Sequence, residues 1–345
     1  MIDLLIAGAG PAGLATALYA ARAGLTTTVV DPRAGPRPDS PPIDKACGEG
    51  LMPGAVLALA DLGVDPPGRD LRGIGYLSAG HRVDASFAAG PGRGVRRTDL
   101  HSALMLAVHT AGIRVLAQSV DGVTQDATGV VAAGLKARYL VAADGLHSPI
   151  TRALGLDLPV HRGRQRWGLR RHFAVAPWSD FVEVHWSDRS EAYLTPVGPR
   201  LVGVAVLSGD RGGFDDQLSA FPDLIGRLSG VQSGPVRGAG PLRRRTARRV
   251  SGRVLLVGDA AGYVDALTGE GIAVSLACAR SLVECVAAGR PADYETRWRR
   301  DSRRYRSITS GLLWASGRPT LRRAIVPAAQ RLPRLFSAAV GQLAR

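Results

Sequence analysis

The sequence has few of the residues that build disulfide frameworks, metal sites or simple hydrolase sites. Its 345 residues include three cysteines, Cys47, Cys278 and Cys285, with neither CxxC spacing nor a paired framework, which favours a reducing cytoplasm. The seven histidines show no metal-ligand spacing, so we expect no metal site. A G-x-S-x-G segment is absent, which argues against a serine hydrolase built on that motif.

The chain also lacks a convincing membrane or export segment. Leu4–Ala21 carries no charge, and its hydropathy alone would fit a signal peptide or a membrane helix. However, the first charged residue is the acid Asp3 rather than a basic cluster, and three glycines and Pro11 interrupt the stretch. We therefore expect a globular, cytoplasmic protein.

Acidic residues are scarce, with 29 against 44 basic residues and a net charge of +15. Most of this imbalance lies at the C-terminus, where twelve arginines from Arg297 onward accompany the single acid Asp301. No nucleic-acid motif accompanies them, so we expect no nucleic-acid partner. A solvated helical face is the simpler interpretation, and contact with an acidic partner or an anionic membrane surface is the alternative.

What the sequence does contain is a dinucleotide-binding pattern near its start. Asp3–Ala7 predicts a buried strand, and Gly8, Gly10 and Gly13 follow with G-x-G-x-x-G spacing before a helix that ends near Arg22. The first glycine permits a tight turn, the second lets backbone approach a pyrophosphate, and the third lets the helix pack on the strand. The positive end of this helix would face the phosphates.

A second predicted strand, Thr26–Val30, delivers Asp31 to its carboxyl end. An acid at this position accepts the ribose hydroxyls of a dinucleotide and would repel a 2′-phosphate. The pattern therefore indicates FAD or NAD rather than NADP as the bound ligand.

The rest of the chain alternates between predicted strands and helices. An aromatic-rich region, Gly163–Leu207, has strand-like alternation and is the candidate substrate-facing sheet. The closing segment from Tyr294 is predicted to be helical and divided by Pro319, Pro327 and Pro333. The other predicted elements are a hairpin over Gly73–Phe87, helices over Gly54–Leu62, Arg97–Thr110, Phe214–Leu228 and from about Gly269 to Ala288, and strands within Ile113–Val123 and over Val130–Ala133, Tyr139–Ala143 and Arg253–Val257.

Three more motifs follow the first glycine pattern in order. They are Arg97 with Leu100 and Leu104, then Asp144, Gly145, Ser148 and Arg152 in a D-G-x-x-S-x-x-R pattern, and then Gly258, Asp259, Ala260 and Ala261. With these motifs, nearly the whole chain resembles the FAD-dependent oxidoreductases that include aromatic-ring hydroxylases of the p-hydroxybenzoate hydroxylase type and geranylgeranyl reductases.

The resemblance implies an α/β fold, with a Rossmann-like FAD-binding domain, an inserted mixed or antiparallel substrate sheet and C-terminal helices. The implied divisions are a discontinuous FAD-binding domain at 1–72, 95–158 and 245–290, a substrate-binding domain at 73–94 and 159–244, and a basic C-terminal helical segment at 291–345.

The resemblance also implies FAD as the bound cofactor and NAD(P)H as a transient electron donor, since no second G-x-G-x-x-G is present for a nicotinamide. The other ligand that the resemblance implies is a small-molecule substrate. The residues implied in cofactor binding are Gly8, Gly10, Pro11, Ala12, Gly13, Asp31, Pro32, Arg33, Ala46, Cys47, Gly48, Arg97, Val120, Asp144, Gly145, Gly258, Asp259, Gly269, Gly271 and Ile272.

Cys47 is the candidate catalytic residue. It lies in a glycine-rich loop next to Lys45, a setting that predicts a thiol with a lowered pKa acting as a proton donor beside the flavin. The alternative is that Cys47 is a small residue filling a tight cofactor loop. Cys278 and Cys285, seven residues apart, are expected to be buried on one face of a helix.

Two reactions fit the motifs. Gly262 and Ala266 stand where the hydroxylases carry histidine and proline, and the segments TGEGI and KACGEGLMP resemble the reductase branch. The D-G motif and the short chain resemble the hydroxylases. We predict an NAD(P)H-dependent monooxygenase that hydroxylates an aromatic or polyketide-like small molecule, with reduction of prenyl or lipid double bonds as the alternative. A non-catalytic basic binding protein is the remote alternative, and a halogenase is disfavoured because W-x-W-x-I-P is missing.

Overall fold

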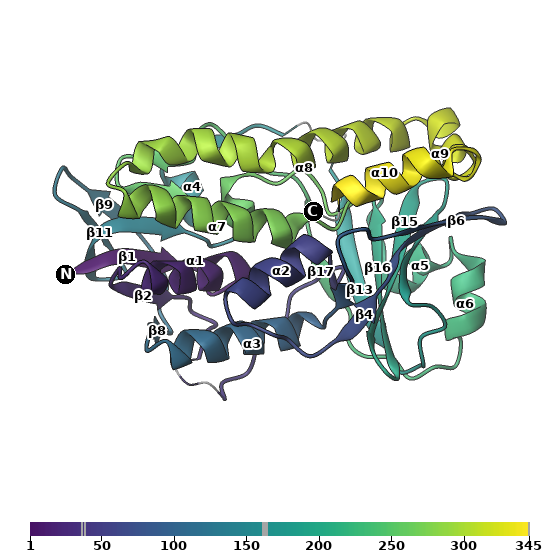
Figure 1. Ribbon diagram of the computed structural model, residues 1–345, viewed down its shortest axis with the longest axis horizontal. Coiled ribbons are helices and arrows are strands. Elements are labelled where there is room, and N and C mark those ends of the chain that lie inside the picture. The colour runs from purple at the N-terminus through teal and green to yellow at the C-terminus, as the bar shows by residue number, and fades with distance from the viewer. Residues whose placement is uncertain (36, 38, 161–164, 344–345) are drawn as a thin grey trace.

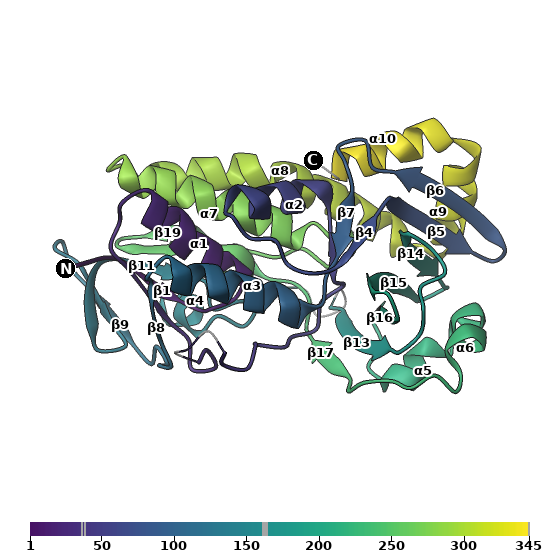
Figure 2. The ribbon, with the colours of Figure 1, turned by 60° about the horizontal axis from the view of Figure 1, so that its bottom comes forward.

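The computed structural model describes residues 1–35, 37, 39–160 and 165–343 of the chain. Residues 36 and 38 of the predicted proline-rich loop, 161–164 of the predicted substrate region and 344–345 lie outside the described residues. Two large sheets occupy opposite ends of an elongated molecule, and α8 (Tyr294–Ser316) runs along both (Figures 1 and 2). The predicted α/β fold, with an inserted mixed sheet and C-terminal helices, is confirmed.

The first sheet has the order β19-β20-β11-β1-β2-β8. In addition, β10 pairs with the start of β11, whose later residues pair with β20, and β9 pairs with β10. The pairings of β1 with β11 and β2, of β11 with β20 and of β2 with β8 are parallel, so their carboxyl ends meet at one edge. The strands are β1 (Ile2–Ala7), β2 (Thr27–Val30), β8 (Arg114–Leu116), β9 (Val123–Gln125), β10 (Val130–Ala132), β11 (Leu135–Ala142), β19 (Val250–Ser251) and β20 (Val254–Leu256).

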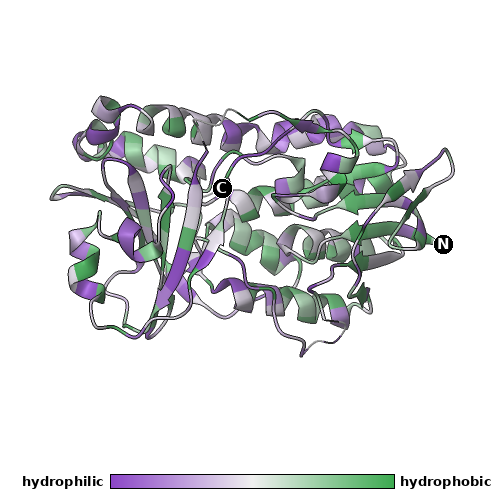
Figure 3. Cartoon of the chain, turned by 180° about the vertical axis from the view of Figure 1, so that it is seen from behind, coloured by the Kyte–Doolittle hydropathy of each residue, from purple (hydrophilic) through white to green (hydrophobic). Residues whose placement is uncertain are grey.

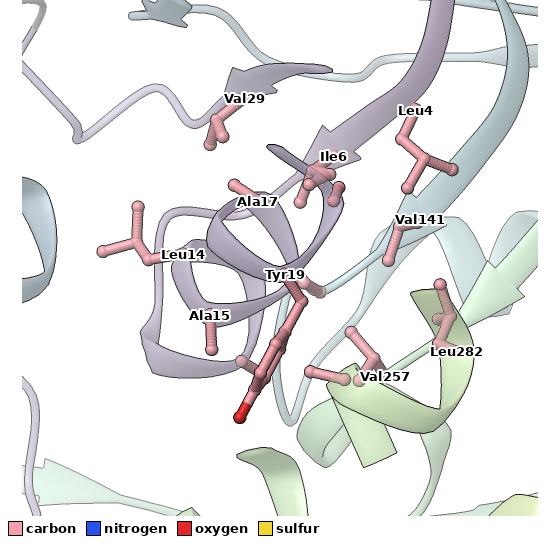
Figure 4. Close-up of a cluster of buried hydrophobic side chains, with 14 of the residues drawn as sticks. Leu4, Ile6, Leu14, Ala15, Ala17, Tyr19, Val29, Val141, Val257 and Leu282 are labelled. Atoms are coloured by element: carbon pink, nitrogen blue, oxygen red, sulfur yellow. The ribbon is translucent and has the colours of Figure 1, made fainter. Parts of the chain in front are cut away.

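The central strands β1, β2, β11 and β20 are largely buried on both faces, which explains their apolar runs. They are among the most uniformly hydrophobic parts of the chain (Figure 3). In the core, Ile6 of β1 lies close to Ala17 of α1 (Pro11–Arg22), while Leu282 of α7 (Gly271–Ala287) lies beside Val257 (Figure 4).

Helix α1 packs against both α7 and α3 (Arg97–Thr110). The helix predictions ending near Arg22 and covering Arg97–Thr110 are confirmed. Shorter elements complete this end of the molecule: α2 (Pro53–Asp61), α4 (Pro149–Ala153), the 3₁₀ helices η2 (Gly258–Ala261) and η3 (Pro291–Asp293), and the small strands β12 (Asp157–Leu158) and β18 (Arg245–Thr246).

The second sheet has the order β17-β13-β16-β15-β14-β5-β6, and only the pairing of β5 with β14 is parallel. The hairpin predicted over Gly73–Phe87 is confirmed as β5 and β6. The strands are β5 (Gly73–Ser78), β6 (His81–Ser86), β13 (Trp167–Phe173), β14 (Phe181–Trp186), β15 (Ser190–Gly198), β16 (Leu201–Ser208) and β17 (Arg237–Ala239), and a three-stranded sheet of β3 (Gly50–Leu51), β7 (Gly92–Gly94) and β4 (Arg69–Leu71) lies beside them.

Each face of the second sheet has its own hydrophobic cluster. On one face, Leu194 and Val204 pack with Phe214 of α5 (Phe214–Leu218) and Leu224 of α6 (Pro222–Leu228). On the other face, residues such as Val184 pack with α9 (Pro319–Arg331) and α10 (Pro333–Leu343). The alternation along the strands therefore supplies two buried faces.

Three element predictions need correction. The single helix predicted over Phe214–Leu228 is two helices, because Pro222 lacks an amide hydrogen and starts a new helix at its first turn. Pro327, predicted to divide the tail, lies inside α9, where the neighbouring Val326 is fully buried. The strand predicted within Ile113–Val123 is only β8, Arg114–Leu116, before β9 begins at Val123.

Within the described ranges, no helix combines the length and the apolar character needed to cross a bilayer. The buried cysteine prediction is confirmed, since Cys278 and Cys285 of α7 are 1% and 2% exposed.

Candidate functional site

A large cavity lies where the carboxyl edge of the first sheet meets the second sheet. Most of the residues predicted to bind the cofactor line it. These are Gly10, Pro11, Ala12, Asp31, Arg33, Ala46, Cys47, Gly48, Arg97, Asp144, Gly145, Gly258, Asp259, Gly269, Gly271 and Ile272.

The three glycines of the turn between β1 and α1 have the separate structural roles predicted for them. A Cβ on Gly8, which has a φ of 112°, would lie 2.3 Å from the Ala143 carbonyl oxygen, and a Cβ on Gly13 would lie 1.9 Å from the Gly8 oxygen. These two glycines permit close packing and do not line the cavity. Gly10 lines the cavity, and its Cβ would meet nothing nearer than Arg97 Nη2 at 4.0 Å. The empty space above Gly10 is where a ligand approaches the backbone.

Two helix N-termini open onto this cavity. Pro11 begins α1 and Gly271 begins α7, both beside cavity-lining glycines. The first amides of a helix lack acceptors within the helix, so both ends offer donors and a partial positive charge. This pairing suits a ligand that carries phosphates and electron-rich carbonyls.

Asp31 ends β2 at the rim of the cavity and is 4% exposed. Its Oδ2 accepts a hydrogen bond from the Ala9 amide at 2.9 Å, and its Oδ1 accepts one from the Arg33 amide at 2.9 Å. The carboxylate is thereby fixed in place with lone pairs left for a ribose.

Two residues carried over from the resemblance lie away from the cavity. Pro32 is exposed and does not line the cavity. Val120 packs against the hydrophobic core of the first sheet instead of facing the cavity. The structure therefore gives neither side chain a position to touch a ligand there.

Arg97 provides the buried cation of the cofactor end. It is 7% exposed, lines the cavity, and its Nη1 is buried with no hydrogen-bond partner among the described residues. Burial lowers the pKa of Arg97, opposed by Cys47 and Asp259. An unpaired buried guanidinium nitrogen is costly, which indicates that a ligand atom completes its hydrogen bonding.

His101 is a residue of this site that the motifs did not identify. Its Nε2 donates to the Ala9 carbonyl at 3.1 Å, and its Nδ1 accepts from the Ile43 amide at 3.4 Å. Burial and the neighbouring Arg97 lower the pKa of His101 to about 4, so the ring is neutral at pH 7. His101 therefore connects α3 to the glycine turn through a hydrogen bond. It lies four residues after Arg97, on the same face of α3.

The D-G motif supports the same edge of the cavity. Asp144 Oδ2 accepts from the Ile150 amide at 3.2 Å, while its Oδ1 is buried without a partner among the described residues. Burial raises the pKa of Asp144. Ser148 caps α4 by accepting from the Thr151 amide at 3.0 Å, so its part in the motif is structural.

The η2 turn brings the third motif to the cavity. Gly258 has a φ of 63°, and its Cβ would lie 2.8 Å from the Ala12 Cβ, so only glycine fits between η2 and α1. Asp259 Oδ2 lies 3.9 Å from Lys45 Nζ, which connects this turn to the cysteine loop.

Cys47 lines the cavity, but the predicted lowering of its pKa is wrong. Burial raises the pKa of the Cys47 thiol, and Glu49 raises it further, while Arg97 acts in the opposite direction. Lys45 lies near Asp259, whose carboxylate partly offsets its charge. The thiol therefore keeps its proton at neutral pH.

A network of buried polar side chains holds the cysteine loop from the second sheet. Glu49, with a φ of 61° and 3% exposure, accepts from the Arg97 amide at 2.9 Å and from His172 Nε2 at 2.7 Å. Arg170 Nη1 donates to His172 Nδ1 at 3.0 Å and pairs with Asp44. Because a guanidinium only donates, the His172 Nε2 carries the proton that Glu49 accepts. Glu49 thus connects α3, the cysteine loop and β13.

The far end of the cavity is apolar. The second sheet contributes Ile74, Val182, Val184 and Leu207, and Leu242 adds to this wall. Tyr193, also in the wall, donates its hydroxyl to the Leu267 carbonyl at 2.8 Å. This end therefore offers shape and hydrophobic contact, with few hydrogen-bonding groups.

The cavity fits FAD at its cofactor end. The open space over Gly10, the unpaired Arg97 Nη1, the fixed Asp31 carboxylate and the two helix N-termini match the pyrophosphate, ribose and ring of that cofactor. Among the described residues, no cluster of three His, Cys, Asp or Glu side chains is placed to hold a metal ion.

Comparisons with known proteins agree with this site. Two family models, both described as "FAD binding domain", match residues 3–37 and 96–211. The menaquinone reductase of Mycolicibacterium smegmatis is 30% identical, over 86% of this chain and 79% of that protein. The digeranylgeranylglycerophospholipid reductase 1 of Methanopyrus kandleri is 26% identical, over 87% of each. The protoasukamycin 4-monooxygenase of Streptomyces nodosus subsp. asukaensis is 30% identical, over 85% of this chain and 83% of that protein.

A solved structure shares the whole fold. A triple mutant of the flavin-dependent brominase Bmp2 matches 100% of this chain and 95% of its own, with a TM-score of 0.83 and 17% identity. At this identity the similarity shows the architecture alone.

Proposed function

Because this chain belongs to the FAD-dependent oxidoreductase superfamily of aromatic-ring hydroxylases and geranylgeranyl reductases, we propose that it reduces an isolated double bond in a prenyl chain or a related lipid. It is an FAD-dependent oxidoreductase, and the identity of its substrate and reaction is the proposal. This choice reverses the order of the two sequence-based predictions, in which the monooxygenase came first.

The apolar far wall of the cavity carries the proposal. A prenyl chain has no hydrogen-bonding groups, so it gains binding energy only by burying apolar surface. The side chains of Val182, Val184 and Leu207 offer such a surface and lie in the same cavity as Cys47. Two of the three relatives compared above are named as reductases of prenylated lipids, since menaquinone also carries a prenyl chain.

Within this proposal, the chain's own residues position the cofactor and handle the proton. FAD, when bound at these residues and reduced by NAD(P)H, would supply the hydride chemistry needed to saturate the double bond. The Cys47 thiol, which burial keeps protonated, donates a proton to one carbon of that bond and recovers a proton from water. The apolar wall excludes water from the reacting bond, and the helix N-termini and Arg97 hold the cofactor. NAD(P)H, arriving transiently, would be the source of electrons.

The monooxygenase remains the second candidate because the protoasukamycin 4-monooxygenase is as similar in sequence as the menaquinone reductase. Gly262 and Ala266, however, replace the histidine and proline of the hydroxylase motif. A protonated thiol beside the cofactor also has a clear use in saturating a double bond.

The deciding experiment is turnover by the FAD-loaded protein with NADH or NADPH, with and without oxygen. The substrates are a polyprenyl alcohol, menaquinone and a set of phenolic aromatic compounds. The reductase predicts anaerobic NAD(P)H oxidation that requires a prenyl compound and a product two hydrogens heavier by mass spectrometry, with both added hydrogens in the prenyl chain and not on the quinone ring. An aromatic product one oxygen heavier, formed only in air, would establish the monooxygenase instead.

A further inference from the structure

Exposed apolar side chains concentrate in the C-terminal helices. Nine large hydrophobic residues are exposed among the described residues, and four of them lie between residues 314 and 335. Trp314, Leu321, Leu332 and Leu335 are exposed by 56%, 39%, 54% and 65%. Single exposed apolar residues are ordinary, but a concentration of them marks a surface that contacts something apolar.

The same residues are surrounded by positive charge. Asp301 is the last acidic side chain in the sequence, so α9 and α10 contain none. Arg318, Arg331 and Arg334 are exposed and form no salt bridge within the described part of the chain. The nearby acid Asp188 is already paired with Arg323. Basic side chains without acidic neighbours favour an anionic partner.

Apolar and basic side chains alternate at both ends of α9. At its start, the Arg318 guanidinium lies 3.8 Å from the centre of the Trp314 ring, with Leu321 one turn further on. At its end, Leu332 and Leu335 flank the α9–α10 turn, where the Leu335 amide donates to the Leu332 carbonyl at 3.1 Å. We call the exposed side chains of residues 314–335 the C-terminal surface. Figures 1 and 2 show α9 and α10 at the outer end of the molecule, over the second sheet.

The inner side of these helices touches the cavity wall. The Phe336 ring of α10 lies 4.9 Å from the ring of Tyr76, and Tyr76 lines the cavity. Val326 and Val340 are buried in the same cluster as Tyr76. A bilayer that met the C-terminal surface would therefore be separated from the apolar cavity by little more than α9, α10 and one layer of aromatic rings.

We propose that the C-terminal surface docks the protein onto an anionic lipid bilayer. Tryptophan and leucine would enter the boundary between headgroups and acyl chains, while the arginines would contact lipid phosphates. Unpaired arginines and exposed apolar side chains on the same helices fit this partner, because a bilayer offers negative charge and apolar volume together. The docking is argued from this surface alone and stands even if the substrate is not a lipid.

The test measures co-sedimentation of the FAD-loaded full chain with unilamellar vesicles. One set contains phosphatidylglycerol and phosphatidylcholine in equal parts, and the other contains phosphatidylcholine alone. We expect binding to the anionic vesicles that weakens with added salt, and little binding to the neutral ones. The double variant R331E/R334E should bind the anionic vesicles at least about thirtyfold more weakly, since each basic residue near such a surface contributes about a factor of five.

Matched variants distinguish binding through the C-terminal surface from non-specific hydrophobic binding. L332S/L335S should also bind about thirtyfold more weakly, whereas L57S/L106S, which changes two equally exposed leucines on α2 and α3, should bind like the parent chain. Retained FAD absorbance shows that each variant is folded.

Several results would overturn the docking. They are equal binding to neutral vesicles, equal losses in both leucine variants, and no vesicle binding by the parent chain. A concentration-dependent dimer that only L332S/L335S disrupts would assign the surface to a second copy of the chain. Since sedimentation needs no turnover, any of these results leaves the proposed reaction untouched, and a failed turnover assay leaves the docking untouched.

Discussion

At the scale of single residues, the chemistry of the partly buried Cys47 thiol depends on its loss of solvation in the cavity wall. The structure raises its pKa, so the thiol is a proton donor over the neutral range and becomes a thiolate only in alkaline solution. We expect the turnover rate of the reductase to be flat from neutral pH upward and to fall only above the ordinary thiol range. If the pKa of the thiol were lowered instead, the thiol would lose its proton below neutral pH, and the turnover rate would already fall there. The check is a pH–rate profile with the prenyl substrate.

The Cys47→Ala variant provides the control for that profile. It removes the donor but leaves the cofactor end intact, so FAD should still bind. Turnover should fall by at least about a hundredfold, the usual contribution of a positioned general acid. An alanine variant with parental turnover would show that Cys47 only fills the loop.

Glu49 is a positioning residue for this thiol. The Glu49→Gln substitution places an amide or a carbonyl where the carboxylate accepts two donors, and it cannot satisfy both the Arg97 amide and the His172 ring equally well. We expect kcat to fall about tenfold, with KM and FAD content little changed, because the loop shifts relative to the cofactor.

Glu183→Gln is the matched control for that variant. Glu183 is equally buried in the second sheet, where it pairs with Arg82 and His185, away from the cysteine loop. Both variants should lose roughly 1–3 kcal/mol of stability, but only the change at Glu49 should lower kcat. Equal kcat in the two variants would reduce Glu49 to a structural role.

At the scale of elements, the β1–α1 turn allows ligand binding to be separated from folding. Gly10 has ordinary extended backbone, with a φ of −76°, and no protein atom would crowd its Cβ. The Gly10→Ala variant should therefore melt like the parent chain without FAD, yet bind FAD at least about tenfold more weakly, a cost of about 1.4 kcal/mol. In Gly13→Ala, the new Cβ would meet the Gly8 oxygen at 1.9 Å. That variant should lose several kcal/mol of stability even without FAD.

Thermal melting of the FAD-free proteins and FAD titration by fluorescence check this pair. A Gly10→Ala protein that binds FAD normally would show that the ligand does not approach the backbone there.

Glu270, at the start of α7, makes stability depend on pH. Burial raises the pKa of Glu270 to about 7 from 4.5, and Arg304 opposes this shift only in part. The folded protein thus holds a proton that the unfolded chain releases, so stability from this group is lost as pH rises from about 4.5 to 7. Glu270→Gln mimics the protonated form and should raise the free energy of unfolding by roughly 3 kcal/mol at pH 8, with almost no effect near pH 4.

Chemical unfolding of both proteins at several pH values tests this prediction. A gain that is equal at pH 4 and pH 8 would show that the effect of the substitution is not electrostatic.

Local elements were predictable where one physical rule dominated. The glycine spacing, the acid at the end of β2 and the helix over Arg97–Thr110 depend on nearby residues, and all three stand in the structure. The Glu49–His172 contact joins residues 123 positions apart, so no local pattern reveals it. The pKa of Cys47 was predicted in the wrong direction for the same reason, because burial depends on the packing of distant segments.

At the scale of the whole molecule, the C-terminal segment is more than a solvated basic face. Arg322 was among the arginines predicted to be solvated, yet it is 7% exposed and pairs with Glu191 Oε1 at 2.7 Å. It also donates to the carbonyls of Ser187, Ser190 and Ser316. The order of motifs along the chain indicated a discontinuous cofactor domain, but it carried no information on where this last segment packs.

Substitutions at Arg322 and its neighbour Arg323 test how α9 is held against the second sheet. Arg322→Ala leaves Glu191, which is fully buried, with Arg166 as its one remaining counter-ion among the described residues and removes donors from three carbonyls. Breaking a buried pair in this way should cost roughly 3 kcal/mol. Arg323 pairs with Asp188 on the surface, where their side chains are 71% and 67% exposed, so Arg323→Ala should cost less than about 1 kcal/mol. Urea unfolding followed by tryptophan fluorescence measures both, and equal losses would mean that α9 is held by its apolar contacts rather than by the buried arginine.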